Sequence, residues 1–413
     1  MFADLLTTVF ERRYRLSPLP RRDNRPVEAL TAELIGASSE TSGLAAARQI
    51  LTRYAAMDDA AKLSFFRHLA GDMNVVPKDV RSALDAYDRA PSGKTYRAFQ
   101  TASEPPRQEL IRRLNQVPGA TGSIVRMRAD LHRLGRGEDA LEALDLDFRH
   151  LLSSWYNRGF LVLRPIDWDT SASVLEKIIA YEAVHAIGSW ADLRRRVEPP
   201  DRRCFAFFHP AMPDEPLIFV EVALTQGVAG SIQDLLAEDR TPLASDKADT
   251  AVFYSISNCQ PGLAGISFGN FLIKQVASDL AAGLPDLKTF VTLSPIPGLT
   301  RWLREQGIGW NPNDAKGMQA LAARYLLSAK RGDGRPLDPV ARFHLGNGAM
   351  VHAVHGQADM SRNGLDQSGG AMVNYLYNLA RVAQNHERYA TKKEVVASQS
   401  VRSLAAQGDR SAA

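Results

Sequence analysis

The chain has 413 residues, of which 45% are hydrophobic, and its 50 basic and 46 acidic side chains leave a net charge of +4. This composition is typical of a globular protein with a sizeable core, and the length favours two domains. Because Lys and Arg form no long run and no stretch of about 18 apolar residues occurs, we expect neither nucleic-acid binding nor a membrane span.

Residues 1–157 are expected to form an all-helical domain. Phe65, Leu69 and Met73 recur at helical spacing after an acidic pair, Asp58-Asp59, which can cap a helix. Pro and Gly separate several such segments, and β-branched residues are sparse. Because this part holds no cluster of candidate catalytic side chains, we expect it to serve packing or to join copies of the chain into a homo-oligomer, a dimer or a tetramer.

From residue 158 the pattern changes to short β-rich runs separated by turns or helices. The runs are FLVLRPI, CFAFF, LIFVEVAL, AVFYSI, TFVTL and AMVHAV. They predict a mixed α/β domain over residues 158–385, which places the whole chain in the α+β class. Residues 386–413 are polar, and we expect a short helix followed by a frayed tail.

Cys204 and Cys259 are the only cysteines, and they lie far apart in the sequence. This excludes a disulfide framework and a zinc site made of cysteines. A reducing compartment, the cytoplasm, is the simplest location for such a chain.

A glycine-rich turn lies between a predicted strand, residues 251–257, and an amphipathic helix, residues 271–283. Glycines at 262, 265 and 269 allow the backbone to approach a ligand closely. A helix N-terminus with unpaired amides is an anion site, most often for phosphate. The next strand ends at Ser294, so the sequence predicts a phosphate-binding turn with a hydroxyl beside it.

Residues 265–269 also read GISFG, which fits the G-x-S-x-G nucleophile elbow of α/β-hydrolases, with Ser267 as the nucleophile. The elbow requires a strand that runs directly into the serine. Here the strand stops near Ser257, and Gln260-Pro261-Gly262 interrupts it. The spacing therefore favours a wide cofactor loop.

Eight segments between residues 150 and 380 occur in an order and spacing that point to one family. They are YEAVHAIGSW (181–190), RRCFAFFHP (202–210), EPLIFVEVALT (215–225), FYSIS (253–257), GLAGISFGNFLIK (262–274), TLSPIPG (292–298), DPVARFHLGNGA (338–349) and MVNYLY (372–377). With them the chain resembles the malonyl-CoA decarboxylase family. The resemblance implies a helical N-terminal domain followed by a GNAT-like catalytic domain that binds CoA.

The implied reaction converts malonyl-CoA to acetyl-CoA and CO2, the work of a carboxy-lyase. Its intermediate is an enolate, which needs oxyanion donors and an acid that protonates carbon. The thioester is itself the electron sink, so we expect no cofactor and no metal. The histidines 344, 352 and 355 do not suggest a metal, because 352 and 355 would fall on opposite faces of a strand.

The resemblance implies that Ser294 and His344 are catalytic, and that Tyr377 orients His344 or the thioester. Pro295 restricts Ser294 to extended geometry. By residue type alone, a turn serine, a hydrogen-bonded strand histidine and a core tyrosine are the alternatives. An imidazole that titrates near neutrality would suit the acid.

The resemblance places the CoA diphosphate on the backbone amides of one loop. Its residues are Ala264, Gly265, Ile266, Ser267, Phe268, Gly269 and Asn270. Elsewhere, Glu221 interrupts an apolar strand; it is either a buried carboxylate with a raised pKa or part of a solvated face.

Three other functions stay open at this point. A GNAT-type acyl-CoA transferase would share the loop and need an amine acceptor. A serine hydrolase would use Ser267. A non-catalytic acyl-CoA sensor would bind the ester without turnover.

Overall fold

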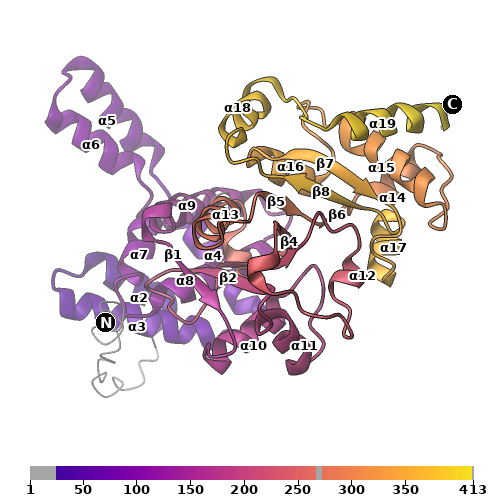
Figure 1. Cartoon of the computed structure of the whole chain (residues 1–413). Coiled ribbons are helices and arrows are strands. Elements are labelled where there is room, and N and C mark those ends of the chain that lie inside the picture. Colours follow the sequence, from indigo (N-terminus) through magenta and orange to yellow (C-terminus); the bar gives the residue numbers. More distant parts are fainter. Residues whose placement is uncertain (1–24, 267–271, 412–413) are drawn as a thin grey trace. The chain divides into compact units, whose positions relative to one another are not determined.

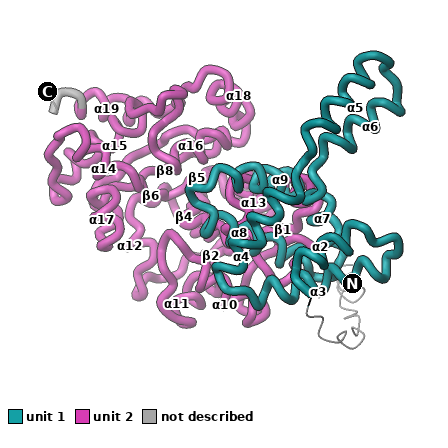
Figure 2. Tube along the Cα trace, turned by 180° about the vertical axis from the view of Figure 1, so that it is seen from behind, with its two compact units in different colours: residues 1–152 teal, residues 153–413 magenta. Residues whose placement is uncertain are grey.

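The computed structural model describes residues 25–266 and 272–411. The chain forms two compact units, which divide after Leu152 (Figure 2). The first unit is helical, and the second is built on one mixed sheet. The expected order, a helical domain followed by a mixed α/β domain, is confirmed.

Unit 1 consists of helices joined by short turns. They are α2 (Val27–Gly36), α3 (Glu40–Ala56), α4 (Asp59–Gly71), α5 (Pro77–Arg89), α6 (Gly93–Ser103), α7 (Pro106–Leu114), α8 (Ala120–Leu134) and the first turns of α9 (Asp139–Trp155). Helix α4 begins where the sequence predicts, because the Asp58 side chain accepts a hydrogen bond from Ala61 N at 2.8 Å. Its apolar face buries Phe65 and Leu69 in the core.

Helices α5 and α6 form a hairpin that extends from the other helices of unit 1 (Figure 1). Neither helix buries a residue. The hairpin is held by its own contacts, among them those of Tyr87 and Tyr96, whose ring centroids are 5.7 Å apart.

Within the part of unit 2 that the structure describes, the sheet has eight strands in the order β1-β2-β3-β4-β5-β8-β6, with β7 paired to β8. The strands are β1 (Val162–Ile166), β2 (Arg202–Phe208), β3 (Ile218–Thr225), β4 (Thr250–Asn258), β5 (Thr289–Thr292), β6 (Ser294–Pro295), β7 (Met350–His355) and β8 (Met372–Leu376). Among the strands of the described residues, only β4 and β5 pair in parallel, and the crossover between them carries α13 (Leu272–Gly283).

The other helices of unit 2 flank this sheet or follow it. They are α10 (Ala172–Tyr181), α11 (Trp190–Val197), α12 (Ile232–Leu235), α14 (Leu299–Glu305), α15 (Ala315–Ser328), α16 (Pro339–Gly346), α17 (Arg362–Ser368), α18 (Val382–Lys392) and α19 (Gln399–Ser411). Apolar residues of α10, α11 and β2 form one core cluster, and those of α12, β4 and β5 form another.

The C-terminal segment differs from expectation. Within residues 386–413, for which we predicted a short helix and then a frayed tail, residues 399–411 form α19, which packs on α15. Val401 and Ala405 are buried, and a Cβ at Gly408 would lie 2.5 Å from Ala320 O. The absence of a side chain at Gly408 therefore permits the close approach of the two helices.

Two features open the sheet at its centre. A bulge between β3 and β4 pairs Glu221 with Ser255 and Val222 with Phe253, which leaves Tyr254 as the extra residue. Beyond β5, Leu293 N still donates to Phe253 O at 2.9 Å, whereas Ser294 pairs with Val373 of β8. The chain therefore follows β4 as far as Leu293 and diverges from it at Ser294, where β6 begins.

Candidate active site

A cavity of about 250 Å3 lies where β4 and β6 part. Its walls come from β4, from β6, from one face of α16 and from the segment after α10. They are Val184, Phe253, Tyr254, Ile256, Asn258, Ser294, Pro295, Pro339, Val340, Phe343 and His344. The cavity therefore brings together two of the three predicted catalytic residues and surrounds them mainly with apolar side chains.

Ser294 is positioned by the sheet. Its side chain is buried, and its backbone is held by the pairing with Val373. The hydroxyl donates a hydrogen bond to Thr292 Oγ1 at 2.8 Å and lies 3.3 Å from His344 Nε2. Ser294 is thus in contact with His344.

His344 lies in the last turn of α16, and the strand expected as its alternative setting is wrong. Pro339 opens this helix, and the Asp338 side chain caps it by accepting from Ala341 N at 2.8 Å. A helix that begins with proline and is capped by an aspartate is thus favoured over a strand at this position. The imidazole is therefore carried by a short rigid element.

Burial determines the protonation of His344. The side chain is 2% exposed, and its ring stacks on Tyr375 with centroids 4.5 Å apart. Burial lowers the pKa of His344 to about 3. The expectation of an imidazole that titrates near neutrality is wrong for this structure, because no acidic partner offsets the cost of removing the charged ring from water.

Tyr377, which directly follows β8, is the third predicted catalytic residue, and it contacts His344. Its hydroxyl lies 2.8 Å from His344 Nδ1, so each ring nitrogen of His344 has a hydroxyl neighbour. Burial raises the pKa of Tyr377 well above its usual range. The phenol is therefore neutral and can donate its hydrogen to Nδ1.

Sequence reasoning missed Thr292. Its Oγ1 accepts from Ser294 and also from Tyr375 N at 3.1 Å, while its carbonyl accepts from Asn374 Nδ2 at 2.7 Å. Thr292 precedes Ser294 by two residues, a spacing that puts two strand side chains on one face. That spacing was the available signal.

The predicted CoA loop is described in part. Ala264, Gly265 and Ile266 follow the 3-10 turn Pro261–Leu263, while positions 267–270, with Ser267, Phe268, Gly269 and Asn270, lie outside the described residues. Ala264 N donates to Pro261 O and Ile266 N donates to Leu263 O, both at 3.1 Å. These two amides are therefore engaged within the turn, and the binding of phosphate by this loop stays a prediction. Gly265, at φ +76, is outside these turn hydrogen bonds.

Glu221 is a buried carboxylate, the first of the two settings weighed for it. Burial, with Glu182 nearby, raises the pKa of Glu221 to about 8. Arg196 Nη1 lies 3.3 Å from its Oε2, whereas Oε1 has no hydrogen-bond partner within the described part of the chain. Glu182 in turn accepts from the hydroxyl of Ser255 at 2.7 Å.

The other histidines do not build a metal centre. His355 Nε2 contacts Asn374 Oδ1, and burial lowers the pKa of His352. Among residues 25–266 and 272–411, no three His, Cys, Asp or Glu side chains are placed to share an ion. In the same ranges, no helix is long and apolar enough to traverse a lipid bilayer.

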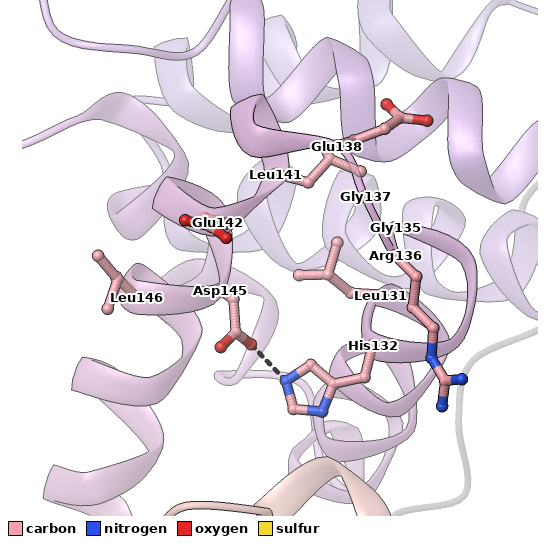
Figure 3. A pocket seen from close by; sticks show the side chains of 10 residues that line it. All are labelled: Leu131, His132, Gly135, Arg136, Gly137, Glu138, Leu141, Glu142, Asp145 and Leu146. Carbon is pink, nitrogen blue, oxygen red and sulfur yellow. Dashed lines mark hydrogen bonds and ion pairs between the residues drawn. The ribbon is translucent and has the colours of Figure 1, made fainter. Parts of the chain in front are cut away.

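A separate cavity of about 410 Å3 lies in unit 1 beside the end of α8 and the start of α9 (Figure 3). One of its charged side chains, Asp145, lies 2.7 Å from His132 Nε2 and accepts from Arg128 Nε at 2.8 Å. This carboxylate is thus paired within the unit. None of the predicted site residues lines the cavity, and we assign it no function.

Comparison with known proteins points to one family. The family model for the malonyl-CoA decarboxylase C-terminal domain matches residues 159–313 and 311–413, and that for the N-terminal domain matches residues 74–156. The mitochondrial malonyl-CoA decarboxylase of Anser anser anser is 34% identical over 349 residues, which are 72% of this chain and 69% of that protein. The enzyme of Mus musculus is 35% identical over 355 residues, 72% of this chain and 70% of the relative.

Two crystal structures are also similar to the chain. Malonyl-CoA decarboxylase from Rhodopseudomonas palustris superimposes with a TM-score of 0.85 at 46% identity, covering 91% of this chain and 98% of that one. The enzyme from Agrobacterium vitis gives a TM-score of 0.86 at 47% identity, with 92% and 99% covered.

Proposed function

Because this chain belongs to the malonyl-CoA decarboxylase family, we propose that it is a carboxy-lyase that converts malonyl-CoA to acetyl-CoA and CO2. The observation that carries this proposal is the contact of Ser294 with His344 in one largely apolar cavity, on a chain that matches family members along most of its length.

The chemistry requires a shift of electrons and then a proton. The bond between C2 and the carboxylate breaks, CO2 leaves, and the electron pair enters the thioester to form an enolate. Donors at the carbonyl oxygen stabilise that charge. The C2–H bond then forms with a proton from the protein, so each turnover consumes one proton.

The apolar walls favour the first step. Val184, Ile256 and Val340 face the same cavity as Ser294 and His344. A malonyl carboxylate held against such side chains loses its hydration, and the loss of CO2 removes that charge. Ser294 limits how the carboxylate and thioester can turn relative to each other.

His344 supplies the proton from Nε2, which faces the cavity beside Ser294. As the Nε2–H bond breaks, the Tyr377 hydroxyl passes its hydrogen to Nδ1, so the ring stays neutral and the charge moves to the phenolate oxygen. A thioester enolate is a far stronger base than an ordinary phenolate, which favours the transfer, whereas the burial that raises the pKa of Tyr377 opposes it. Tyr377 also lines a second cavity, of about 520 Å3, from which water can return the proton.

The CoA diphosphate would bind at the loop of residues 264–270, with the amide of Gly265 as the donor in the described part. The loop leads into α13, whose N-terminal dipole favours negative charge. Because the thioester accepts the electrons, the reaction needs no pyridoxal, thiamine, biotin or metal.

The test is incubation of the purified full chain with malonyl-CoA and mass analysis of the products. Acetyl-CoA and CO2 without an added acceptor are expected. Free malonate would indicate a hydrolase, product only with an added amine would indicate an acyltransferase, and tight binding without product would indicate a sensor. Each of these three results would overturn the proposal.

We also propose that the chain works as a homo-oligomer in the cytoplasm. Cys204 and Cys259 are both unpaired and buried, which suits a reducing compartment. Light scattering on the purified chain would give the number of copies.

A further inference from the structure

The side chain of Thr292 ends a chain of hydrogen bonds that begins at Tyr377. We propose that Thr292 is a positioning residue that holds His344 in the tautomer with its hydrogen on Nε2. The catalytic consequence of this inference rests on the proposed decarboxylation, whereas the tautomer itself does not.

The hydrogen of the Ser294 hydroxyl points toward Thr292. Ser294 Oγ donates to Thr292 Oγ1 at 2.8 Å. A serine hydroxyl has one hydrogen, so Ser294 Oγ has only lone pairs left for His344. The 3.3 Å contact with Nε2 is then a hydrogen bond only if Nε2 carries the hydrogen.

The other side of the ring agrees with this direction. Tyr377 Oη lies 2.8 Å from Nδ1, and as a neutral phenol it can donate to a bare nitrogen. Because burial keeps His344 neutral, the ring holds a single hydrogen, and the tautomer decides which nitrogen carries it. The donors therefore all point one way, from Tyr377 through His344 and Ser294 to Thr292.

Thr292 can be the last acceptor in this series of hydrogen bonds because β8 fixes it in place. Its Oγ1 also accepts from Tyr375 N at 3.1 Å, so both lone pairs of that oxygen are occupied. Its carbonyl accepts from Asn374 Nδ2 at 2.7 Å, and the side chain is fully buried. The acceptor is thus part of the sheet and cannot turn away without breaking backbone hydrogen bonding.

The direction has a chemical meaning. In the reverse direction the Ser294 hydroxyl would donate its hydrogen to a bare His344 Nε2, which is the arrangement that activates a serine as a nucleophile. In the direction set by Thr292, Nε2 holds a hydrogen that it can give to the enolate carbon. The C2–H bond forms as Nε2–H breaks, and the Tyr377 hydrogen moves to Nδ1. The hydrogen-bond direction therefore suits the pair of Ser294 and His344 to acid catalysis.

The experiment measures the tautomer by NMR on the full chain labelled with 15N-histidine, without substrate. The His344 signals are those that disappear in His344→Gln. We expect a protonated, pyrrole-type Nε2 and a bare, pyridine-type Nδ1 in the unaltered protein. A hydrogen on Nδ1 would overturn the proposal.

Thr292→Val removes the acceptor at nearly constant volume, and Thr292→Ser restores a hydroxyl. We expect Thr292→Val to give a mixture of tautomers and to lower kcat about tenfold to a hundredfold with KM little changed. Thr292→Ser should resemble the unaltered protein in both readouts. Thr225→Val, the same change at the end of β3 and outside both cavities, should leave both unaffected.

If Thr292→Val kept the Nε2 hydrogen and full kcat, Thr292 would have no such role. Should Thr292→Val fail to fold, the spectra of the unaltered chain and of Thr292→Ser decide the question. Because the spectra need no turnover, a lack of acetyl-CoA would count against the proposed function and not against the tautomer.

Discussion

Ser294 Oγ lies 3.3 Å from His344 Nε2, although 50 positions separate the two residues in the sequence. The contact exists because the chain stops bonding to β4 after Leu293 and pairs with β8 at Ser294, while α16 presents its last turn to the gap. Two rigid elements therefore hold the pair, and substitution of either partner tests a defined geometry.

His344→Gln should lower kcat by about 10²- to 10⁴-fold, because the enolate loses its general acid. CoA binding should change little, since the loop of residues 264–270 is untouched. Isothermal calorimetry with CoA and CO2 release from malonyl-CoA give the two quantities. Wild-type turnover in this variant would show that His344 is not the acid.

Tyr377→Phe should lower kcat about tenfold or more, because the hydrogen bond to Nδ1 and the compensating proton are lost. The matched control is Tyr389→Phe, which removes a buried hydroxyl that has no hydrogen-bond partner in the described structure. Stopped-flow or steady-state CO2 release separates the two variants. Equal activities for them would remove Tyr377 from the mechanism.

Gly265→Asp should weaken CoA binding about fivefold to tenfold relative to Gly265→Asn. Asn and Asp have the same shape and both tolerate the positive φ of this position, so only the added charge differs. Calorimetric titration with CoA measures the ratio. Equal affinities for the two variants would place the diphosphate elsewhere.

Asp338→Ala should destabilise the protein by about 1 to 2 kcal/mol, because α16 loses its N-cap and the helix carries His344. Asp338→Asn should keep most of the cap, since its side-chain oxygen can accept the same hydrogen bond. Urea denaturation and kcat are measured on both variants. A stable, fully active Asp338→Ala protein would mean that the cap does not position α16.

Glu221→Gln should change the pH dependence of stability. Because the pKa of Glu221 is raised from 4.5 to about 8, the folded state keeps a proton that the unfolded chain releases within this window. The contribution of the Glu221 proton to the stability of the folded state is fully present below about pH 4.5 and is lost as the pH rises through about 8. The free energy of unfolding of Glu221→Gln should therefore rise relative to that of the unaltered protein as the pH rises from about 5 to 8. The rise should be at most about 1.4 kcal/mol per pH unit.

Chemical denaturation at three pH values measures this trend. Glu198→Gln is the control, because Glu198 is exposed and the hydrogen bond from Arg194 lowers its pKa. If the stability difference between Glu221→Gln and the unaltered protein did not depend on pH, Glu221 would be ionised in the fold.

Local patterns were enough to predict much of this protein. The helical spacing of Phe65 and Leu69 and the cap at Asp58 predicted α4, and the β-rich runs predicted most of the sheet. These features depend on neighbours a few residues apart, which the sequence displays directly. The motifs around Ser294 and His344 identified the residues that meet in the cavity.

The tertiary structure alone decided how those residues can act. Thr292 acquires its role from the pairing of β5 and β6 with β8, and the pKa of His344 falls because the fold removes its ring from water. Likewise, α19 forms because α15 offers it a surface, although its own sequence is polar. Burial, hydrogen-bond direction and packing between distant segments are properties of the assembled chain, so no local pattern contains them.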